Sequence, residues 1–284
     1  MIGTSRANVR WPTRYHFLRA LSRGEGLEEL RVRDEGHGFD VFGANADWVR
    51  LGAGLTRFLY ERWFRVLSHG GENIPSAGPA ILAANHGGAL PFDGAMVWAD
   101  VLRQTRPPRL ARPIEDNFVP LLPFASTLFH RAGAVGGSRG NVRRLLDDGE
   151  LLLIFPEGTE GIGKPFKERY RLRPFRVGHV ELAIRHRAPV IPVGVVGAEE
   201  QLPQLAKIEW GVQAFGIPHV PITASPFPLP VRYRIRYGPQ IRFDLPPEAA
   251  DDPKAVFAAR DRVQGEVDRL ISEGLAERRG RWFA

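Results

Sequence analysis

The chain contains no cysteine among its 284 residues. This absence excludes disulfide bonds, thiolate metal sites and cysteine nucleophiles. The sequence also lacks an uninterrupted apolar stretch of about 20 residues, the length that crosses a bilayer. No apolar stretch follows the charged start of the chain to form a signal peptide. We therefore expect a protein that is soluble or lies on a surface.

The charge of the chain is unbalanced. Lys and Arg number 39 against 32 Asp and Glu, a net charge of +7, and arginine strongly outnumbers lysine. Such an excess favours anionic partners, including phosphate groups on lipids, nucleotides or nucleic acids. No recognised nucleic-acid-binding motif accompanies the charge, so we expect no nucleic-acid partner.

Short apolar runs alternate with helical patterns along the middle of the chain. The runs 79–84, 151–155 and 190–196 are almost wholly apolar, which is typical of strands covered on both faces. Helical periodicity is found over residues 94–103, 142–147 and 179–187. The alternation predicts an α/β fold, with a mostly parallel central sheet flanked by helices.

The remaining segments suggest how the chain is organised. Residues 1–45 mix charges and glycines without a sustained period, and we expect an N-terminal extension with at most a short helix near 15–21. Residues 46–284 are expected to form a single domain. Outside its motif-bearing core, 70–200, we expect a proline-rich surface loop at 202–230, a strand at 231–237 with one buried and one basic face, and a closing helix at 253–275.

A basic amphipathic helix is expected over residues 48–67. Its apolar side chains fall on one face, with arginines interspersed: Trp48, Leu51, Leu55, Phe58, Leu59, Trp63 and Leu67. Such a helix either lies in a membrane interface or packs its apolar stripe on the protein's own core. The sequence leaves both open.

The segment after the first apolar run carries a histidine and an aspartate. His86 and Asp93 are separated by glycines and a Leu-Pro pair, so we expect them to face each other across a short loop. A carboxylate that orients an imidazole makes a general base near neutral pH. The alternative is that Asp93 only caps the helix that follows.

A second cluster follows the next apolar run. Phe155-Pro156-Glu157-Gly158-Thr159 begins where that strand is expected to end. Two strand ends of one parallel sheet share a crevice, so Glu157 and the amides beyond it are candidates to touch a substrate. The alternative is a simple turn.

A third cluster lies in the glycine-rich stretch 129–141, which contains Arg131 and Arg139 and leads into a helix. Glycine amides and arginine side chains both suit a phosphate group, although a linker with solvated arginines has the same composition. A competing motif, 158–164, matches the first seven positions of a nucleotide-binding P-loop. Pro165 stands where that motif needs Ser or Thr, which disfavours an NTPase.

In this order the blocks resemble the glycerophospholipid acyltransferases of the lysophosphatidic-acid, PlsC-like type. The blocks are Asn85-His86 with Asp93, Gly133 to Arg139, Phe155 to Thr159, and Val190 to Val193. The resemblance covers residues 70–200. Six residues separate His86 from Asp93, whereas the family's usual pattern has four. This wider form resembles a branch of the same superfamily seen in bacterial and diacylglycerol-forming relatives.

The resemblance implies a reaction. An acyl group would pass from an acyl thioester, acyl-CoA or acyl carrier protein, to a hydroxyl of a lysophospholipid or related glycerolipid. His86 would act as the base oriented by Asp93, and backbone amides near the loop would stabilise the oxyanion. The acceptor would be bound by residues of the other blocks, namely Arg131, Arg139, Glu157, Gly158 and Thr159.

The resemblance also implies no metal and no cofactor beyond the co-substrate, and a cytoplasmic protein peripheral on the inner face of the membrane, held through the helix 48–67. Two alternatives remain open: a thioester or lipid hydrolase with the same dyad, and a non-catalytic membrane-surface protein that binds lipid.

Overall fold

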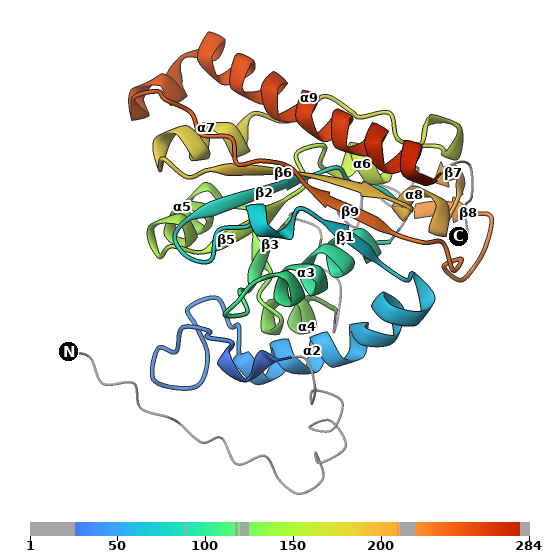
Figure 1. The fold of residues 1–284 in the computed structure, drawn as a ribbon, viewed down its shortest axis with the longest axis horizontal. Helices are drawn as coiled ribbons and strands as arrows, with labels where there is room; N and C mark the ends of the chain where they lie inside the picture. The colour runs from blue at the N-terminus through green and yellow to red at the C-terminus, as the bar shows by residue number, and fades with distance from the viewer. Residues whose placement is uncertain are drawn as a thin grey trace, which may run out of the picture.

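A seven-stranded sheet forms the centre of the protein in the computed structural model (Figure 1). The structure describes residues 26–88, 90–116, 119, 125–208, 210 and 220–278. The helix expected near 15–21 lies outside them. The strand order is β1-β9-β6-β2-β5-β3-β4, with β1 Leu67–His69, β2 Ala80–Ala84, β3 Ala111–Glu115, β4 Val135–Gly136, β5 Leu151–Ile154, β6 Val190–Val196 and β9 Arg234–Tyr237.

The sheet is mostly parallel, as expected. Strands β6, β2, β5, β3 and β4 run in one direction, while β9 is antiparallel to β6 and parallel to β1. The carboxyl ends of the five parallel strands therefore meet at one side of the sheet, called here the carboxyl edge. Open α/β sheets usually bind their ligands at such an edge.

Helices cover both faces of the sheet. One face packs against α5 Arg139–Asp147, α7 Gly178–Arg185 and α9 Pro253–Arg278. The other packs against α3 Phe92–Gln104, which in turn contacts α2 Ala46–Phe58; α4 Ala125–Arg131 packs against α2 (Figure 1). Strand β2 shows why the central runs are wholly apolar: Ile81 faces the first core and Leu82 the second.

Shorter elements connect the main ones. They are η2 Leu27–Glu29, the π-helix η3 Leu59–Trp63, η4 Gly71–Asn73, α6 Thr159–Ile162, η6 Phe166–Glu168, α8 Ala198–Gln201, β7 Gln204–Ile208, β8 Val220–Thr223 and η8 Pro247–Asp251. Within the described ranges, no helix combines the length and the apolar character needed to span a bilayer.

Two segments differ from the sequence-based expectation. The region 202–230 is not only a loop, because β7 and β8 pair within it as a separate antiparallel hairpin. The strand expected at 231–237 is shorter, and its basic face is covered: Arg234 is buried, and Arg236 forms ion pairs with Glu273 and Glu277 of α9. The long C-terminal helix packs over this face, which the alternating pattern alone does not reveal.

The amphipathic segment 48–67 is helical only to Trp63, and Leu67 already belongs to β1. The side chain of Asn45 caps α2 by accepting hydrogen bonds from the amides of Asp47 and Trp48.

The residues of α2 that are fully buried are not those of the predicted apolar stripe. Val49 and Ala53 are buried, whereas Leu55 and Phe58 of the stripe are 52% and 60% exposed. The core contact of α2 thus uses a different face, and part of the stripe is left at the surface.

Residues 26–45, expected to belong to an extension, pack against the domain. Leu27 and Leu30 are buried with side chains of α2 and α3. The Asp40 carboxylate accepts a 2.6 Å hydrogen bond from Nη1 of Arg112 in β3, and both side chains are buried. A buried ion pair of this kind ties the segment to the sheet, because the loss of either charge would leave the other buried without its direct partner.

Replacing Asp40 with Ala is expected to lower the free energy of unfolding by about 3 kcal/mol, because Arg112 would keep a buried charge without its partner. Urea unfolding followed by circular dichroism measures this change. Asp251→Ala is the matched control: its carboxylate pairs with Arg185 but is 72% exposed, so its loss should cost under about 1 kcal/mol. Equal effects of the two variants would contradict the structural role of Asp40.

Candidate active site

Asn85 continues the sheet beyond the end of β2. Its side-chain amide donates to the carbonyl of Val195 over 3.0 Å, and its side-chain oxygen accepts from the Val195 amide over 2.7 Å. These two bonds attach the residue to β6, where a strand bond would otherwise be. The next residue, His86, therefore leaves the sheet at the carboxyl edge in a defined direction.

His86 and Asp93 face each other, as the motif predicts. Nδ1 of His86 lies 2.5 Å from Oδ2 of Asp93, and the carboxylate is fully buried. The same oxygen accepts from the Gly87 amide over 2.9 Å, while Oδ1 accepts from the Gly94 amide in the first turn of α3. Asp93 thus contacts the imidazole and an amide of the first helical turn, but it is not the N-cap of α3, which is Pro91.

The other ring nitrogen of His86 points away from this pair. With Nδ1 donating to the carboxylate, Nε2 carries the lone pair of the neutral ring. No hydrogen bond to Nε2 is found among the described residues, and the side chain is 16% exposed. The Phe155 ring stacks on the imidazole at 4.2 Å between centroids and fixes its plane. Nε2 of His86 therefore has no hydrogen-bond partner within the described part of the chain.

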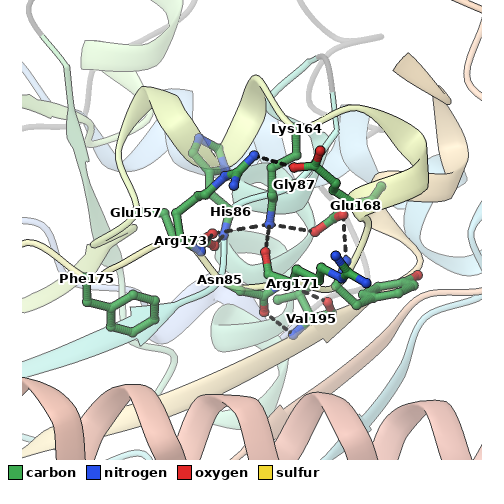
Figure 2. Close-up of polar contacts among 12 residues, drawn as sticks. Asn85, His86, Gly87, Glu157, Lys164, Glu168, Arg171, Arg173, Phe175 and Val195 are labelled. Carbon is green, nitrogen blue, oxygen red and sulfur yellow. Dashed lines mark hydrogen bonds and ion pairs between the residues drawn. The ribbon is translucent and has the colours of Figure 1, made fainter. Parts of the chain in front are cut away.

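Glu157 holds the main chain of His86. Its Oε1 accepts from the His86 amide over 2.9 Å, and its Oε2 accepts from Nζ of Lys164 and from the amide of Arg173 (Figure 2). The residue is 1% exposed. The contacts recorded for Glu157 are therefore internal, and its part in substrate binding stays a prediction.

Lys164 extends this network to the end of β6. Its ammonium group lies 2.9 Å from Oε1 of Glu199, as well as close to Glu157, and its side chain is 2% exposed. Burial raises the pKa of Glu199, and the neighbouring Lys164 opposes that rise. The lysine that completed the partial P-loop match is thus enclosed between two carboxylates.

Two glycines allow the chain segments to approach closely. A Cβ on Gly161 would lie 2.8 Å from Cβ of His86, so a side chain there would displace α6 or the histidine. Gly158 has φ +60°, a conformation that side chains rarely adopt, and a Cβ there would lie 2.6 Å from the Arg176 guanidinium carbon. Thr159 follows it as the first residue of α6 and is half-buried.

The two arginines proposed from the glycine-rich stretch lie in different surroundings. Arg131 donates to the carbonyl of Gly43 and stacks over the Phe39 ring at 4.0 Å. Arg139, at the start of α5, is 91% exposed and lies 3.5 Å from Glu181. The structure does not bring either guanidinium into a recorded contact with His86 or Glu157, and their phosphate-binding role stays a prediction.

Arg176 is a candidate that the sequence analysis did not select. Its amide donates to the carbonyl of Pro156, its guanidinium packs on Gly158, and its side chain is 61% exposed. Asp116 lies 4.0 Å away. Arg176 therefore presents a cation beside the Phe-Pro-Glu-Gly turn. In the sequence it stands apart from every motif, among other arginines.

Several backbone amides in and beside the loop from His86 to Asp93 already donate hydrogen bonds within the protein. Those of His86, Gly87 and Gly94 all donate to the carboxylates of Glu157 or Asp93. These three amides are therefore not available to an oxyanion, and the expected role of backbone amides near the loop stays a prediction. The described residues include no group of three or more His, Asp or Glu side chains placed to hold a metal ion.

Glu115 ends β3 at the same edge. Neither of its carboxylate oxygens accepts a hydrogen bond in the described structure, although Nε2 of His130 lies 3.3 Å from Oε2. Burial raises the pKa of this carboxyl to about 7 from an ordinary value of 4.5.

The sheet with its helices and the His-Asp pair at the carboxyl edge define an α/β acyltransferase-type fold, and comparison with known proteins agrees. The family model described as Acyltransferase matches residues 65–196. An uncharacterized protein of Mycobacterium tuberculosis is 38% identical over 239 residues, covering 81% of this chain and 67% of that protein. The chain therefore belongs to the acyltransferase family.

More distant relatives carry functional names. The human "DGAT1/2-independent enzyme synthesizing storage lipids" is 27% identical over 219 residues, 74% of this chain and 66% of that protein. The 1-acyl-sn-glycerol-3-phosphate acyltransferase of Limnanthes alba is 30% identical over 123 residues, 40% of this chain and 38% of that protein.

The fold is also that of a solved structure. The crystal structure of the 1-acyl-sn-glycerophosphate (LPA) acyltransferase PlsC from Thermotoga maritima matches with a TM-score of 0.53 at 17% identity. The match covers 95% of this chain and 90% of that one. At this identity the likeness concerns the fold.

The raised pKa of Glu115 predicts that the stability of the protein depends on pH. Because its pKa is raised to about 7 on folding, the native state keeps a proton that the unfolded chain releases. The free energy of unfolding of the wild type, relative to Glu115→Gln, should therefore fall as pH rises from about 5 to about 8. Urea unfolding at both pH values measures the difference. Glu72→Gln, at an exposed position, is the control, and a pH-independent difference for Glu115→Gln would contradict the buried carboxyl.

Proposed function

We propose that the protein transfers a fatty acyl group from an acyl thioester to a hydroxyl of a lysophospholipid or a related glycerolipid. The donor is acyl-CoA or an acyl carrier protein. The proposal rests on the 2.5 Å contact between His86 Nδ1 and Asp93 Oδ2, which leaves Nε2 as a base at the carboxyl edge. Family membership and the printed names of relatives support a lipid acceptor.

In this proposal, His86 acts as the base of a direct acyl transfer. Nε2 of His86 takes the proton of the acceptor hydroxyl, and the oxygen attacks the thioester carbonyl carbon. The imidazolium is stabilised by Asp93. The tetrahedral intermediate breaks its carbon–sulfur bond, and the leaving thiolate takes the proton back from Nε2. A new ester and a free thiol result, with no acyl-enzyme intermediate.

The Glu157 network has a positioning role in this proposal. It fixes the His86 main chain between the ends of β2 and β5, while Phe155 fixes the ring plane. The base is thus held in place before substrate arrives, which removes part of the ordering cost from the reaction.

We also propose that the protein works on the inner face of the cytoplasmic membrane as a peripheral protein. The apolar stripe of α2 supports this, since Leu55 and Phe58 remain exposed beside Arg57 and Arg62. Exposed apolar side chains with flanking arginines suit the interface of an anionic bilayer.

A hydrolase with the same dyad is the nearest alternative. In it, water would replace the acceptor hydroxyl, and thiol release would proceed without added lipid. A non-catalytic lipid-surface protein would give no thiol release.

His86→Ala and Asp93→Asn are each expected to lower kcat/KM for acyl transfer about a thousandfold, because the first removes the base and the second removes the carboxylate that orients it. The double variant should be little worse than either single one, since the two residues act as a unit. Lipid products formed from a long-chain acyl-CoA and lysophospholipids or monoacylglycerol are measured by mass spectrometry. His69→Ala, at a half-exposed histidine paired with Glu277, is the control. Acyl transfer by His86→Ala at the wild-type rate would contradict the proposal.

Arg176 is expected to bind an acceptor phosphate. Arg176→Ala should raise KM for a phosphate-bearing lysolipid at least about tenfold, the loss of a charge-assisted hydrogen bond, and leave monoacylglycerol unaffected. Steady-state kinetics with both acceptors measure this, with Arg176→Lys as a partial rescue. Arg139→Ala, at the exposed arginine of α5, is the matched comparison. An unchanged KM in Arg176→Ala combined with a raised one in Arg139→Ala would assign the phosphate to the glycine-rich stretch.

A further inference from the structure

The hairpin of β7 and β8 has a partly exposed apolar face among the described residues. Its strands pair Ala206 with Ile222 and Ile208 with Val220, so these four side chains share one face of the two-stranded sheet. Ile208, Val220 and Ile222 are 47%, 41% and 44% exposed. A two-stranded hairpin by itself is only marginally stable in water. An exposed apolar face on such a hairpin indicates a surface that binds a partner.

The hairpin begins next to the carboxyl edge of the sheet. Strand β7 follows α8, which carries Glu199 of the buried ion-pair network, and the side-chain amide of Gln204 lies 3.4 Å from the Gly163 carbonyl beside Lys164. Figure 1 shows β7 and β8 at one end of the sheet, next to α8. The hairpin therefore begins near the edge that carries His86.

The apolar surface continues onto the end of α2. Phe227, after β8, is 74% exposed, and the next residue, Pro228, accepts a 3.1 Å hydrogen bond from the indole nitrogen of Trp63. The Trp63 ring lies 6.2 Å from that of Phe58, which is 60% exposed. Three apolar segments thus lie near one another in the fold, and their residues are called here the apolar rim: Phe58, Trp63, Ile208, Val220, Ile222 and Phe227.

The charge around the rim is positive. Residues 57–65 contain three arginines, Arg57, Arg62 and Arg65, against the single acid Glu61, residues 204–210 contain one lysine and one glutamate, and residues 220–232 contain one arginine and no acid. Arg65 donates to the carbonyl of Pro230, which places a guanidinium between the two segments. A second copy of the chain would oppose like charges across this surface, whereas anionic lipid head groups would complement them.

We propose that the apolar rim docks on the surface of an anionic lipid bilayer, with the β7–β8 hairpin as a second contact beside α2. The carboxyl edge then faces the membrane, and a lipid acceptor reaches His86 from the bilayer. This inference rests on the proposed acyl transfer to a lipid. The rim is also small for a stable dimer, which buries roughly 20–30 residues on each side.

The test compares Ile222→Ser/Phe227→Ser with the wild type. Flotation with vesicles of phosphatidylglycerol and phosphatidylcholine measures binding, and we expect the double variant to bind at least about tenfold more weakly, because two exposed apolar side chains no longer enter the interface. Transfer to a long-chain acceptor in the same vesicles should fall in parallel. Transfer to a short-chain, monomeric lysolipid should stay at the wild-type rate.

Phe257→Ser is the matched control. Phe257 is 49% exposed on α9, outside the rim, and its replacement removes a comparable exposed ring without changing vesicle binding. Wild-type binding by the double variant would overturn the inference. So would a change from dimer to monomer in light scattering with vesicle binding intact, because it would assign the rim to a second copy. If the wild type itself transfers no acyl group to any acceptor, the proposed function fails, whereas the vesicle binding of the variants still decides the docking surface.

Discussion

The buried carboxylate of Glu157 is the constraint on which the candidate site depends. It accepts hydrogen bonds from the His86 amide, the Lys164 ammonium group and the Arg173 amide, and it has almost no contact with water. A charge removed from water is tolerated only when such partners surround it. Moving His86 would therefore leave a buried charge with one donor fewer, so the position of the histidine is coupled to the stability of the fold around it.

The topology of the sheet makes this constraint possible. Strand β2 lies between β5 and β6, and all three run parallel. The residues that follow β2 are consequently held from both sides, Asn85 by the main chain of Val195 in β6 and His86 by Glu157 beyond β5. Asp93 then enters from the start of α3 to hold the imidazole. One loop receives support from three elements.

Part of the fold could be predicted from local patterns, since β2, β5 and β6 are buried on both faces and their runs are apolar throughout. Strand β3 was not predicted, because Arg112 and Glu115 interrupt its apolar pattern. The burial of these two side chains depends on distant segments of the chain. The hairpin was not predicted, because its apolar side chains lie partly exposed among the described residues and the proline-rich pattern of 202–230 resembled a loop. The faces of β9 were misjudged because α9, far along the chain, covers its arginines.

The sequence by itself determined which side chains follow each central strand, because a buried strand is visible in its own residues and the chain must turn where it ends. The facing of His86 and Asp93 across a short loop belongs to that local information. Only the tertiary structure decided which partners the side chains of the lysine and the arginines have. Lys164 is enclosed between Glu157 and Glu199, Arg176 returns to Gly158, and Arg139 points to solvent. The partners of these cations depend on which distant segments fold back to the carboxyl edge. The local spacing of residues in the sequence does not specify which segments do so.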